Sequence, residues 1–274
     1  MFQQKVVIIT GGSSGIGKAL AQELGRQGAR VVITGRREKE LFDAANELQQ
    51  EGIQVLAIVS DVSVQAQTYE VVQQTLEKFG RVDILINNAG LTMRSMFEDA
   101  DVDATIRRLM DVNFMGTVYM TQAALPHIKR TKGSIVGISS IAGYRGLPVR
   151  TGYSASKFAL NGFLEALRSE LLPQGVHVLT ACPGFTASNI RFSALDAHGQ
   201  AAGSTVRDEG KMMSSEEVAH RIAQAIARRK RTLILTSEGI LTVWLNKLFP
   251  RLTDWLVIRE LAKEKDSPLR EYVS

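Results

Sequence analysis

The sequence predicts an α/β protein built on one doubly wound parallel sheet of about seven strands, followed by a C-terminal helical extension. Short, continuous apolar runs rich in Val and Ile alternate along the chain with longer amphipathic stretches. Strands without polar alternation are typical of parallel sheets that helices cover on both faces. With 274 residues, of which 45% are hydrophobic and 22% are charged, the chain can bury such a core in a single domain.

Each strand and helix follows from these two patterns. The predicted strands cover residues 5–10, 29–34, 54–61, 82–87, 133–140, 176–182 and 231–236. The predicted helices cover residues 16–27, 38–51, 63–79, 98–129, 154–172 and 215–229. Ligands of such sheets bind beyond the carboxyl ends of the strands, so the residues that follow each strand are the candidates for function.

A glycine-rich loop, TGGSSGIG, separates the first strand from the first helix. Gly11 and Gly15 permit a tight turn and a close approach of the backbone to a pyrophosphate, and Gly17 lets helix and strand pack closely. The amides at the start of the helix suit an anion. In this strand–loop–helix context the loop predicts dinucleotide binding and a Rossmann fold.

The second and third strands end in charged residues. Gly35 stands where a carboxylate would bind a ribose 2′-hydroxyl, and Arg36 and Arg37 follow it. Arginine offers a planar fork to phosphate oxygens, so NADP(H) is favoured over NAD, the alternative being two arginines on an exposed turn. Asp61 is placed to accept from an adenine amino group and could equally cap the helix that begins near Ser63, and the two roles are compatible.

Polar residues also follow the fourth and fifth strands. The segment NNAG, residues 87–90, is an amide-rich turn that can tie two strand ends together. The segment GISSIAG brings Ser139 and Ser140 to the mouth of the sheet. Asn113 interrupts an apolar helical run in which asparagine has poor propensity, and such a residue is ordinarily structural.

In the stretch TGYSASK, Tyr153 and Lys157 are one helical turn apart, so their side chains share a face about 6 Å from each other. A lysine ammonium there favours tyrosinate and lowers the phenol pKa from about 10. Such a tyrosine could exchange protons near neutral pH. An isolated pair of this kind is more often a solvated helix face, so its meaning depends on the rest of the chain.

Composition excludes several other classes of protein. The only cysteine, Cys182, precludes an internal disulfide and fits a reducing compartment, and the N-terminus shows no signal peptide, so a cytoplasmic location is expected. The net charge is +5, but the basic residues are dispersed except for RRKR at 228–231, which closes a helix; nucleic-acid binding is not expected. The 4 histidines show no metal-ligand spacing.

Taken together, TGGSSGIG, NNAG, Asn113, GISSIAG, YSASK and CPG resemble the short-chain dehydrogenase/reductase family in order and spacing, over about residues 5–190. The resemblance implies that Tyr153 protonates the substrate oxygen in ketone reduction and acts as the base in alcohol oxidation. It implies that Lys157 lowers the pKa of Tyr153 and holds the nicotinamide ribose, that Ser140 hydrogen-bonds the substrate oxygen, and that Asn113 steadies a water. No metal is needed.

The resemblance also implies a cofactor site. It comprises Gly11, Ser13, Ser14, Gly15, Ile16 and Gly17 at the pyrophosphate; Arg36 and Arg37 at the 2′-phosphate; Asp61 and Val62 at the adenine; Asn88, Ala89 and Gly90 at the adenosine ribose; and Pro183, Gly184 and Thr186 at the nicotinamide, beside Tyr153 and Lys157. The family usually has Val or Ile and then Thr after PG, whereas this chain has Thr186 and Ser188.

The C-terminal end departs from many members of the family. We assign residues 1–236 to a Rossmann-fold dinucleotide-binding and catalytic domain, and residues 237–274 to a helical extension of it. Residues 239–261 are rich in Leu, Ile and Trp, but charges and Pro250 interrupt them, so they are not expected to span a bilayer. They could pack over the substrate pocket, pack against a second subunit in a homodimer, or lie on a membrane surface.

This ending resembles the branch of the family that acts on lipids, steroids or long-chain 3-keto compounds. The expected function is therefore NADP(H)-dependent hydride transfer between nicotinamide and a lipophilic ketone or secondary alcohol. Two alternatives remain, a reductase of small polar carbonyls and a non-catalytic NADP-binding scaffold protein. The polar loop 191–214 is expected to cover the pocket and does not decide between them.

Overall fold

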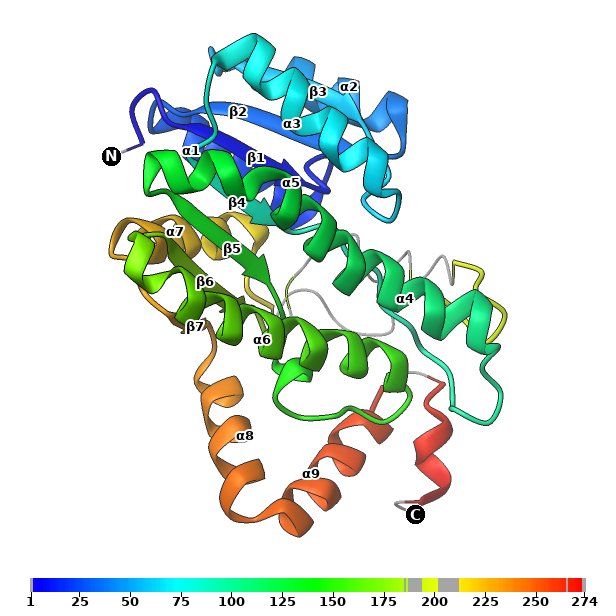
Figure 1. The fold of residues 1–274 in the computed structure, drawn as a ribbon. Helices are drawn as coiled ribbons and strands as arrows, with labels where there is room; N and C mark the ends of the chain where they lie inside the picture. Colours follow the sequence, from blue (N-terminus) through cyan, green and yellow to red (C-terminus); the bar gives the residue numbers. More distant parts are fainter. Residues whose placement is uncertain (1, 185, 187–193, 202–211, 265, 273–274) are drawn as a thin grey trace.

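The computed structural model describes residues 2–184, 186, 194–201, 212–264 and 266–272. Within them, seven parallel strands form one sheet in the order β3-β2-β1-β4-β5-β6-β7, which confirms the doubly wound topology (Figure 1). The strands are β1 (Val6–Thr10), β2 (Arg30–Gly35), β3 (Val55–Val59), β4 (Ile84–Asn87), β5 (Ser134–Ile138), β6 (His177–Cys182) and β7 (Thr232–Ile234).

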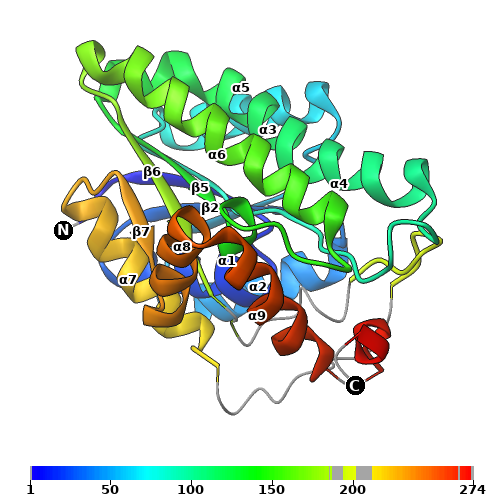
Figure 2. The same cartoon turned by 90° about the horizontal axis from the view of Figure 1, so that it is seen from below.

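Helices cover both faces of the sheet (Figures 1 and 2). One face carries α1 (Gly15–Arg26), α2 (Glu38–Gln50) and α7 (Ser215–Ala227), and the other carries α3 (Gln65–Phe79), α5 (Gly116–Thr131) and α6 (Thr151–Leu171). The alternation of strand side chains explains the two layers, because Val7 and Ile9 of β1 belong to the first core and Ile8 to the second. All three are fully buried.

The predicted helix 98–129 begins later than expected and is irregular. It starts at Val102, because the Asp101 side chain accepts hydrogen bonds from the amides of Asp103 and Ala104, both at 2.9 Å, and so caps the first turn. Two π-helical segments, residues 102–107 and 111–115, flank the short α4 (Arg108–Met110) and precede α5. The second segment contains Asn113. Such π turns are frequent at functional sites.

The chain continues past the sheet as α8 (Ser237–Leu248) and α9 (Pro250–Ala262), followed by a short 3₁₀ helix at residues 268–272. The break falls at Phe249, as expected from Pro250, which begins the second helix because it lacks an amide hydrogen. We call α8 and α9 the C-terminal hairpin. It folds beneath the sheet, and α9 returns towards the first turn of α6 (Figures 1 and 2).

A small apolar cluster joins the end of the hairpin to the loop before α6. Its buried members are Val149, Leu261, Ala262 and Leu269. Among the helices of the described residues, none combines the length and the apolar composition that crossing a bilayer requires. The boundary between residues 236 and 237 stays a prediction.

Candidate active site

A cleft of about 2530 Å³ runs along the carboxyl ends of the strands. The glycine loop, the tips of β2 to β6, the start of α6 and one face of the C-terminal hairpin line it. The cleft brings together the predicted site residues Gly11, Ser13, Ser14, Gly15, Ile16, Arg36, Arg37, Asp61, Val62, Asn88, Ala89, Gly90, Ser140, Tyr153, Lys157, Pro183, Gly184 and Thr186. Gly17 and Asn113 lie behind its lining.

The glycine loop has the backbone that a dinucleotide requires. Gly11 and Gly15 have positive φ angles of 65° and 53°, which favour glycine strongly. A Cβ atom on Gly17 would lie 2.2 Å from the Gly11 carbonyl oxygen, so only glycine lets α1 approach the loop this closely. With the first turn of α1 at its edge, the loop fits a pyrophosphate group.

The NNAG turn ties β4 to the glycine loop. The side-chain amide of Asn88 donates to the carbonyl oxygens of Thr10 and Gly11, at 2.9 and 3.0 Å. The backbone amides of Asn88 and Ala89 both donate to the Thr10 hydroxyl, at 3.0 and 2.9 Å. The turn therefore joins two strand ends, as the sequence predicts, and holds the loop in place beneath the cleft.

Asp61 makes contacts that differ from the predicted helix cap. Helix α3 begins at Gln65, and the Asp61 carboxylate instead accepts from the amide and hydroxyl of Ser63, at 2.9 and 2.6 Å. It also lies 3.6 Å from Nη1 of Arg36. Partial burial alone would raise the pKa of Asp61, but the hydrogen bonds from Ser63 and the charge of Arg36 lower it below its ordinary value.

The two arginines after β2 differ in their surroundings. Arg36 points towards Asp61 across the tips of β2 and β3, with 46% of its side chain exposed. Arg37 lies 3.5 Å from Glu40 in the first turn of α2 and is 63% exposed. Both line the cleft, but Arg36 is held on the cleft side by an ion pair that the sequence did not reveal.

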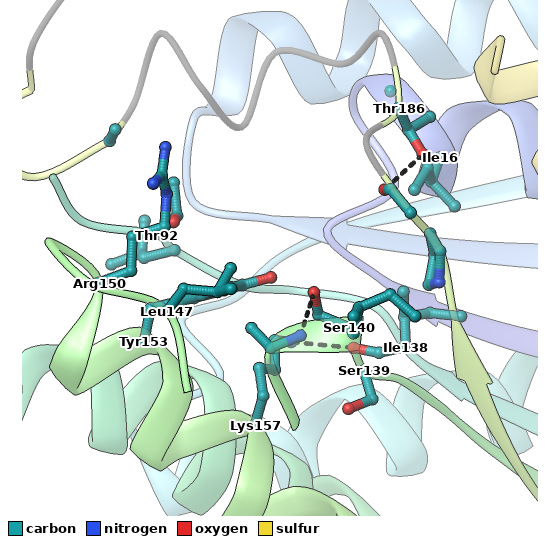
Figure 3. Close-up of a pocket in the computed structure, with 18 of the residues that line it drawn as sticks. Ile16, Thr92, Ile138, Ser139, Ser140, Leu147, Arg150, Tyr153, Lys157 and Thr186 are labelled. Carbon is teal, nitrogen blue, oxygen red and sulfur yellow. Dashed lines mark hydrogen bonds between the residues drawn. The ribbon is translucent and has the colours of Figure 1, made fainter. Parts of the chain in front are cut away.

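Tyr153, Lys157 and Ser140 converge beyond the carboxyl end of β5 (Figure 3). Because α6 begins at Thr151, Tyr153 and Lys157 lie one turn apart on the same face, with the Lys157 ammonium 5.8 Å from the centre of the tyrosine ring. The ammonium donates to the Ile138 carbonyl oxygen at 2.9 Å. Burial lowers the pKa of Lys157 to about 8, so the ammonium stays mostly charged at neutral pH.

The expectation that the pKa of Tyr153 lies below its ordinary value is wrong for this structure. Burial raises the pKa of the tyrosine hydroxyl, and the hydrogen bond with Ser140 and the charge of Arg150 oppose this effect only in part. Helical spacing alone could not reveal that the rest of the fold partly buries the ring. The hydroxyl is consequently protonated at neutral pH, the form in which it can donate a proton.

Asn113 is buried and bridges two elements around the site. Its carbonyl oxygen accepts from the Leu91 amide at 2.7 Å, and its amide donates to the Leu91 carbonyl and to the Ser156 hydroxyl, both at 2.9 Å. A Cβ atom on Gly90 would lie 3.2 Å from the Asn113 oxygen and 3.7 Å from the Lys157 nitrogen. Asn113 therefore fixes the chain after β4 against α6 close to Lys157.

The structure separates the two serines that follow β5. The Ser139 hydroxyl donates to Asn161 of α6 at 2.6 Å, whereas the Ser140 hydroxyl accepts from the Ala142 amide at 3.1 Å and interacts with Tyr153. Cys182, at the end of β6, is fully buried, and burial raises its pKa to about 12. The sequence suggested no role for Asn161, whose contact leaves Ser140 as the serine that faces Tyr153.

The segment after β6 is described only in part. Pro183 and Gly184 line the cleft, and the Thr186 hydroxyl donates to the Gly184 carbonyl at 3.2 Å. Ser188 and most of the predicted covering loop 191–214 lie outside the described residues. Within that loop, Ala194, Leu195, Met212 and Met213 line the cleft.

Sequence reasoning missed a charged cluster in the lining of the cleft. Arg94, Arg150 and Glu264 lie in its lining, and Glu264 comes from the residues that follow α9. One signal was visible, since Arg150 precedes Tyr153 by three positions, but its partner is 114 residues away in the chain. Apolar residues of the hairpin, among them Leu245, form the neighbouring wall.

Comparisons with known proteins agree with this fold and site. The sequence profile of the short chain dehydrogenase family matches residues 5–198. The chain therefore belongs to the short-chain dehydrogenase/reductase family and is an oxidoreductase. Its relatives include the rat (Rattus norvegicus) dehydrogenase/reductase SDR family member 7B, 34% identical over 96% of this chain and 83% of the relative.

A second relative, the Arabidopsis thaliana 11-beta-hydroxysteroid dehydrogenase-like 4A, is 39% identical over 90% of this chain and 82% of the relative. Among solved structures, a short chain dehydrogenase/reductase from Burkholderia phymatum in complex with NAD matches with a TM-score of 0.81 and 26% identity, over 92% of this chain and 95% of its own. An alcohol dehydrogenase from Thermococcus sibiricus, complexed with 5-hydroxy-NADP, matches with a TM-score of 0.74 and 27% identity, over 84% of this chain and 95% of its own.

Proposed function

We propose that this protein is an NADP(H)-dependent oxidoreductase that interconverts lipophilic ketones and secondary alcohols. The observation that carries the proposal is the convergence of Ser140, Tyr153 and Lys157 at one end of a cleft whose other end fits a dinucleotide. Bound NADPH would supply the hydride. The residues of the chain then have to hold the carbonyl compound, provide a proton and exclude water.

We assign the proton to Tyr153. Burial keeps its hydroxyl protonated at neutral pH, and Ser140 lies close enough to hydrogen-bond with it. A carbonyl oxygen held by both hydroxyls would receive the Tyr153 proton as negative charge develops on that oxygen. The nearby Lys157 ammonium would stabilise the tyrosinate that forms, and Asn113 would position the chain around Lys157.

The preference for NADP(H) over NAD is assigned to Arg36. Gly35 provides no carboxylate to repel a 2′-phosphate, and Arg36 keeps its guanidinium on the cleft side of the β2 tip. Arg37 is the secondary candidate. One of the similar solved structures carries NAD and another carries 5-hydroxy-NADP, so titration of the wild-type protein with both cofactors is the direct test.

The assignment of a lipophilic substrate rests on the C-terminal hairpin. Its residues Leu241, Leu245, Leu256, Val257 and Leu261 line the cleft. An apolar wall favours a long-chain or polycyclic ketone over a small polar carbonyl, since burial of each methylene contributes about 0.8 kcal/mol. The similarity to a protein named 11-beta-hydroxysteroid dehydrogenase-like 4A supports a lipophilic substrate.

The outer face of the same hairpin supports contact with a membrane surface through residues 239–261. Exposed apolar side chains that do not line the cleft occur there: Ile240, Trp244, Leu248, Phe249, Leu252 and Trp255. The exposed cations Lys247, Arg251 and Arg259 stand among them and suit anionic headgroups. A homodimer that covers this surface is the competing proposal. Binding to liposomes, with the oligomeric state in solution, separates the two.

The scaffold alternative is less well supported, because Asn113, Ser140, Tyr153 and Lys157 are all present and lie around one site. A protein retained only for binding NADP would not need them. The deciding experiment is a screen of carbonyl compounds of graded chain length with NADPH. Oxidation of NADPH with at least one class of ketone is expected, and its absence with every compound would favour the scaffold.

A further inference from the structure

A cluster of buried charges lies in the cleft and takes no part in the proposed proton transfer. The Glu264 carboxylate, on a residue that is 3% exposed, accepts hydrogen bonds at both oxygens from Nη2 of Arg150, at 3.0 and 2.9 Å. Nε of Arg94 lies 3.6 Å from the same carboxylate. Because a buried carboxylate without a cation would be strongly destabilising, these arginines account for its presence.

Arg150 has donor capacity left after this ion pair. Nη2 alone is used for Glu264, and the Arg150 side chain is only 13% exposed. Nη1 is buried and has no hydrogen-bond partner among the residues that the structure describes. A buried N–H group without an acceptor costs on the order of 1–3 kcal/mol. An oxygen atom of a ligand in the cleft would satisfy it.

The charge of the Arg150 guanidinium favours a negatively charged oxygen. The negative charge of Glu264 neutralises the positive charge of one arginine, and the negative charge of Asp266 acts on Arg94. Arg108, whose Nη1 donates to the Gly199 carbonyl at 3.0 Å, adds a further positive charge to the lining. A guanidinium keeps its charge at all relevant pH values and binds carboxylate or phosphate through parallel N–H donors.

The position of Arg150 connects this site to the reaction. Arg150 directly precedes α6, three positions before Tyr153, and its positive charge acts on the Tyr153 hydroxyl. Figure 3 shows Arg150 beside Thr92 and Leu147, on the Tyr153 side of the cleft. A group bound by Arg150 and a carbonyl held at Tyr153 can therefore belong to one molecule.

We propose that Arg150 recognises an anionic oxygen group, a carboxylate or a phosphate, carried by the lipophilic ketone or alcohol substrate. This inference rests on the proposed function and narrows its substrate class to amphipathic anions. The apolar wall of the hairpin binds the hydrocarbon part, and Glu264 holds Arg150 in place from the end of the same hairpin. The hairpin thus contributes to both halves of substrate recognition.

The test compares long-chain keto carboxylates with their methyl esters, and the corresponding keto phosphates with their dimethyl esters, using NADPH and several spacer lengths. Wild-type protein should turn over one of the anions with a kcat/KM at least about tenfold above that of its neutral ester. The preferred pair distinguishes carboxylate from phosphate. Arg150→Gln should bring this ratio close to one. An effect of the substitution on Tyr153 or on the cofactor changes kcat/KM for the anion and for its ester equally, so it does not change their ratio.

Arg145→Gln is the matched control. Arg145 also joins the hairpin to the rest of the protein, through Asn246 at 3.1 Å and through Asp254, but it is not part of the cleft lining. Its substitution should leave the ratio unchanged. If Arg150→Gln does not fold, Arg150→Lys provides the second variant, because it keeps a cation beside Glu264 but loses the planar fork of N–H donors, and it should lower the preference for the anion.

Binding gives a readout that does not depend on turnover. Decanoate should raise the melting temperature of the wild-type protein more than decanol does, and this difference should vanish in Arg150→Gln. Equal kcat/KM values for the anions and their esters, or a ratio that survives Arg150→Gln, would overturn the inference. If no ketone is turned over while decanoate binding depends on Arg150, the proposed function fails and the anion site stands.

Discussion

The carboxyl edge of the sheet and the C-terminal hairpin line the same cleft, yet they are built differently. At the sheet edge, Asn88, Asn113 and Lys157 are partly or fully buried and donate to backbone carbonyls at 2.9 to 3.0 Å. The hairpin instead leaves large apolar side chains exposed, with 60% of Trp244 and 64% of Leu248 accessible. Most surfaces of isolated globular proteins do not carry such a patch.

The difference indicates which region carries out the reaction and which region selects the substrate. A network of satisfied hydrogen bonds holds one geometry in the folded chain, which suits groups that must meet a reacting carbonyl. An exposed apolar surface does not hold groups in one fixed geometry. It is stabilised when a substrate, a membrane or a second subunit covers it. The reaction is therefore ascribed to the sheet edge, and the choice of substrate and surroundings to the hairpin, so variants in the two regions should change different quantities.

The largest effect is expected at the sheet edge, for Tyr153→Phe. The variant removes only the transferable hydroxyl, so kcat/KM for any accepted ketone should fall by about 10³-fold, within the range that general acids contribute. Affinity for NADPH, measured by fluorescence titration, should change little. Near-wild-type turnover would refute the assignment of the proton to Tyr153.

The second largest effect is expected on the affinity for the cofactor. Arg36→Ala should weaken binding of NADPH by about 30-fold, since a hydrogen bond to a charged group contributes about 1.5–3 kcal/mol, and it should leave NADH nearly unaffected. Arg37→Ala is the matched control and should have a smaller effect, because Arg37 is paired with Glu40 and more exposed. Equal affinity of the wild-type protein for both cofactors would reject the NADP(H) preference.

At the sheet edge, the burial of the Lys157 ammonium lowers the stability of the folded protein. Its pKa is about 8 in the folded protein and 10.5 in the unfolded chain, so below pH 8 folding buries a charge that the unfolded state solvates freely. Stability should rise between about pH 8 and 10.5, where the unfolded chain binds the additional proton. Lys157→Met should flatten this rise and stabilise the cofactor-free protein at pH 7 by up to about 3 kcal/mol.

Denaturant unfolding of wild-type protein and Lys157→Met at several pH values measures this effect. Activity of the variant should be lost even though its stability increases. Identical slopes of stability against pH for the two proteins would show that the lysine is not desolvated in the folded state.

A smaller effect is expected on the hairpin. Trp244→Ser should reduce co-sedimentation with anionic liposomes several-fold and leave turnover of a water-soluble ketone unchanged. Phe97→Ser is the control, because Phe97 is 62% exposed but does not belong to the hairpin surface. If wild-type protein stays in the supernatant at low salt and is dimeric by light scattering, the surface belongs to a subunit interface.

Much of the fold and site followed from the sequence because those features are local. Apolar runs predicted all seven strands to within a few residues, and the glycine loop predicted the positive φ angles of Gly11 and Gly15. The π-helical turns around Asn113 were not predicted, since a period of 3.6 residues does not reveal a widened turn. Family membership followed from several short motifs in one order.

The errors concern contacts between distant parts of the chain. A helix cap was one of two roles considered for Asp61, but β2 and β3 bring Arg36 beside it and its hydrogen bonds go to Ser63. The pKa of Tyr153 was misjudged because burial depends on the whole fold and not on its spacing from Lys157. The Arg150–Glu264 pair forms only when the hairpin returns to α6.

The central claim is that the sheet edge reduces ketones with NADPH while the hairpin selects lipophilic ones. Its most direct test is the kcat/KM of wild-type protein for a series of methyl ketones of increasing chain length, all measured with NADPH. We predict that kcat/KM rises with each added methylene, by up to about fourfold where the methylene is fully buried. A flat or falling series, or activity confined to small polar carbonyls, would contradict the claim.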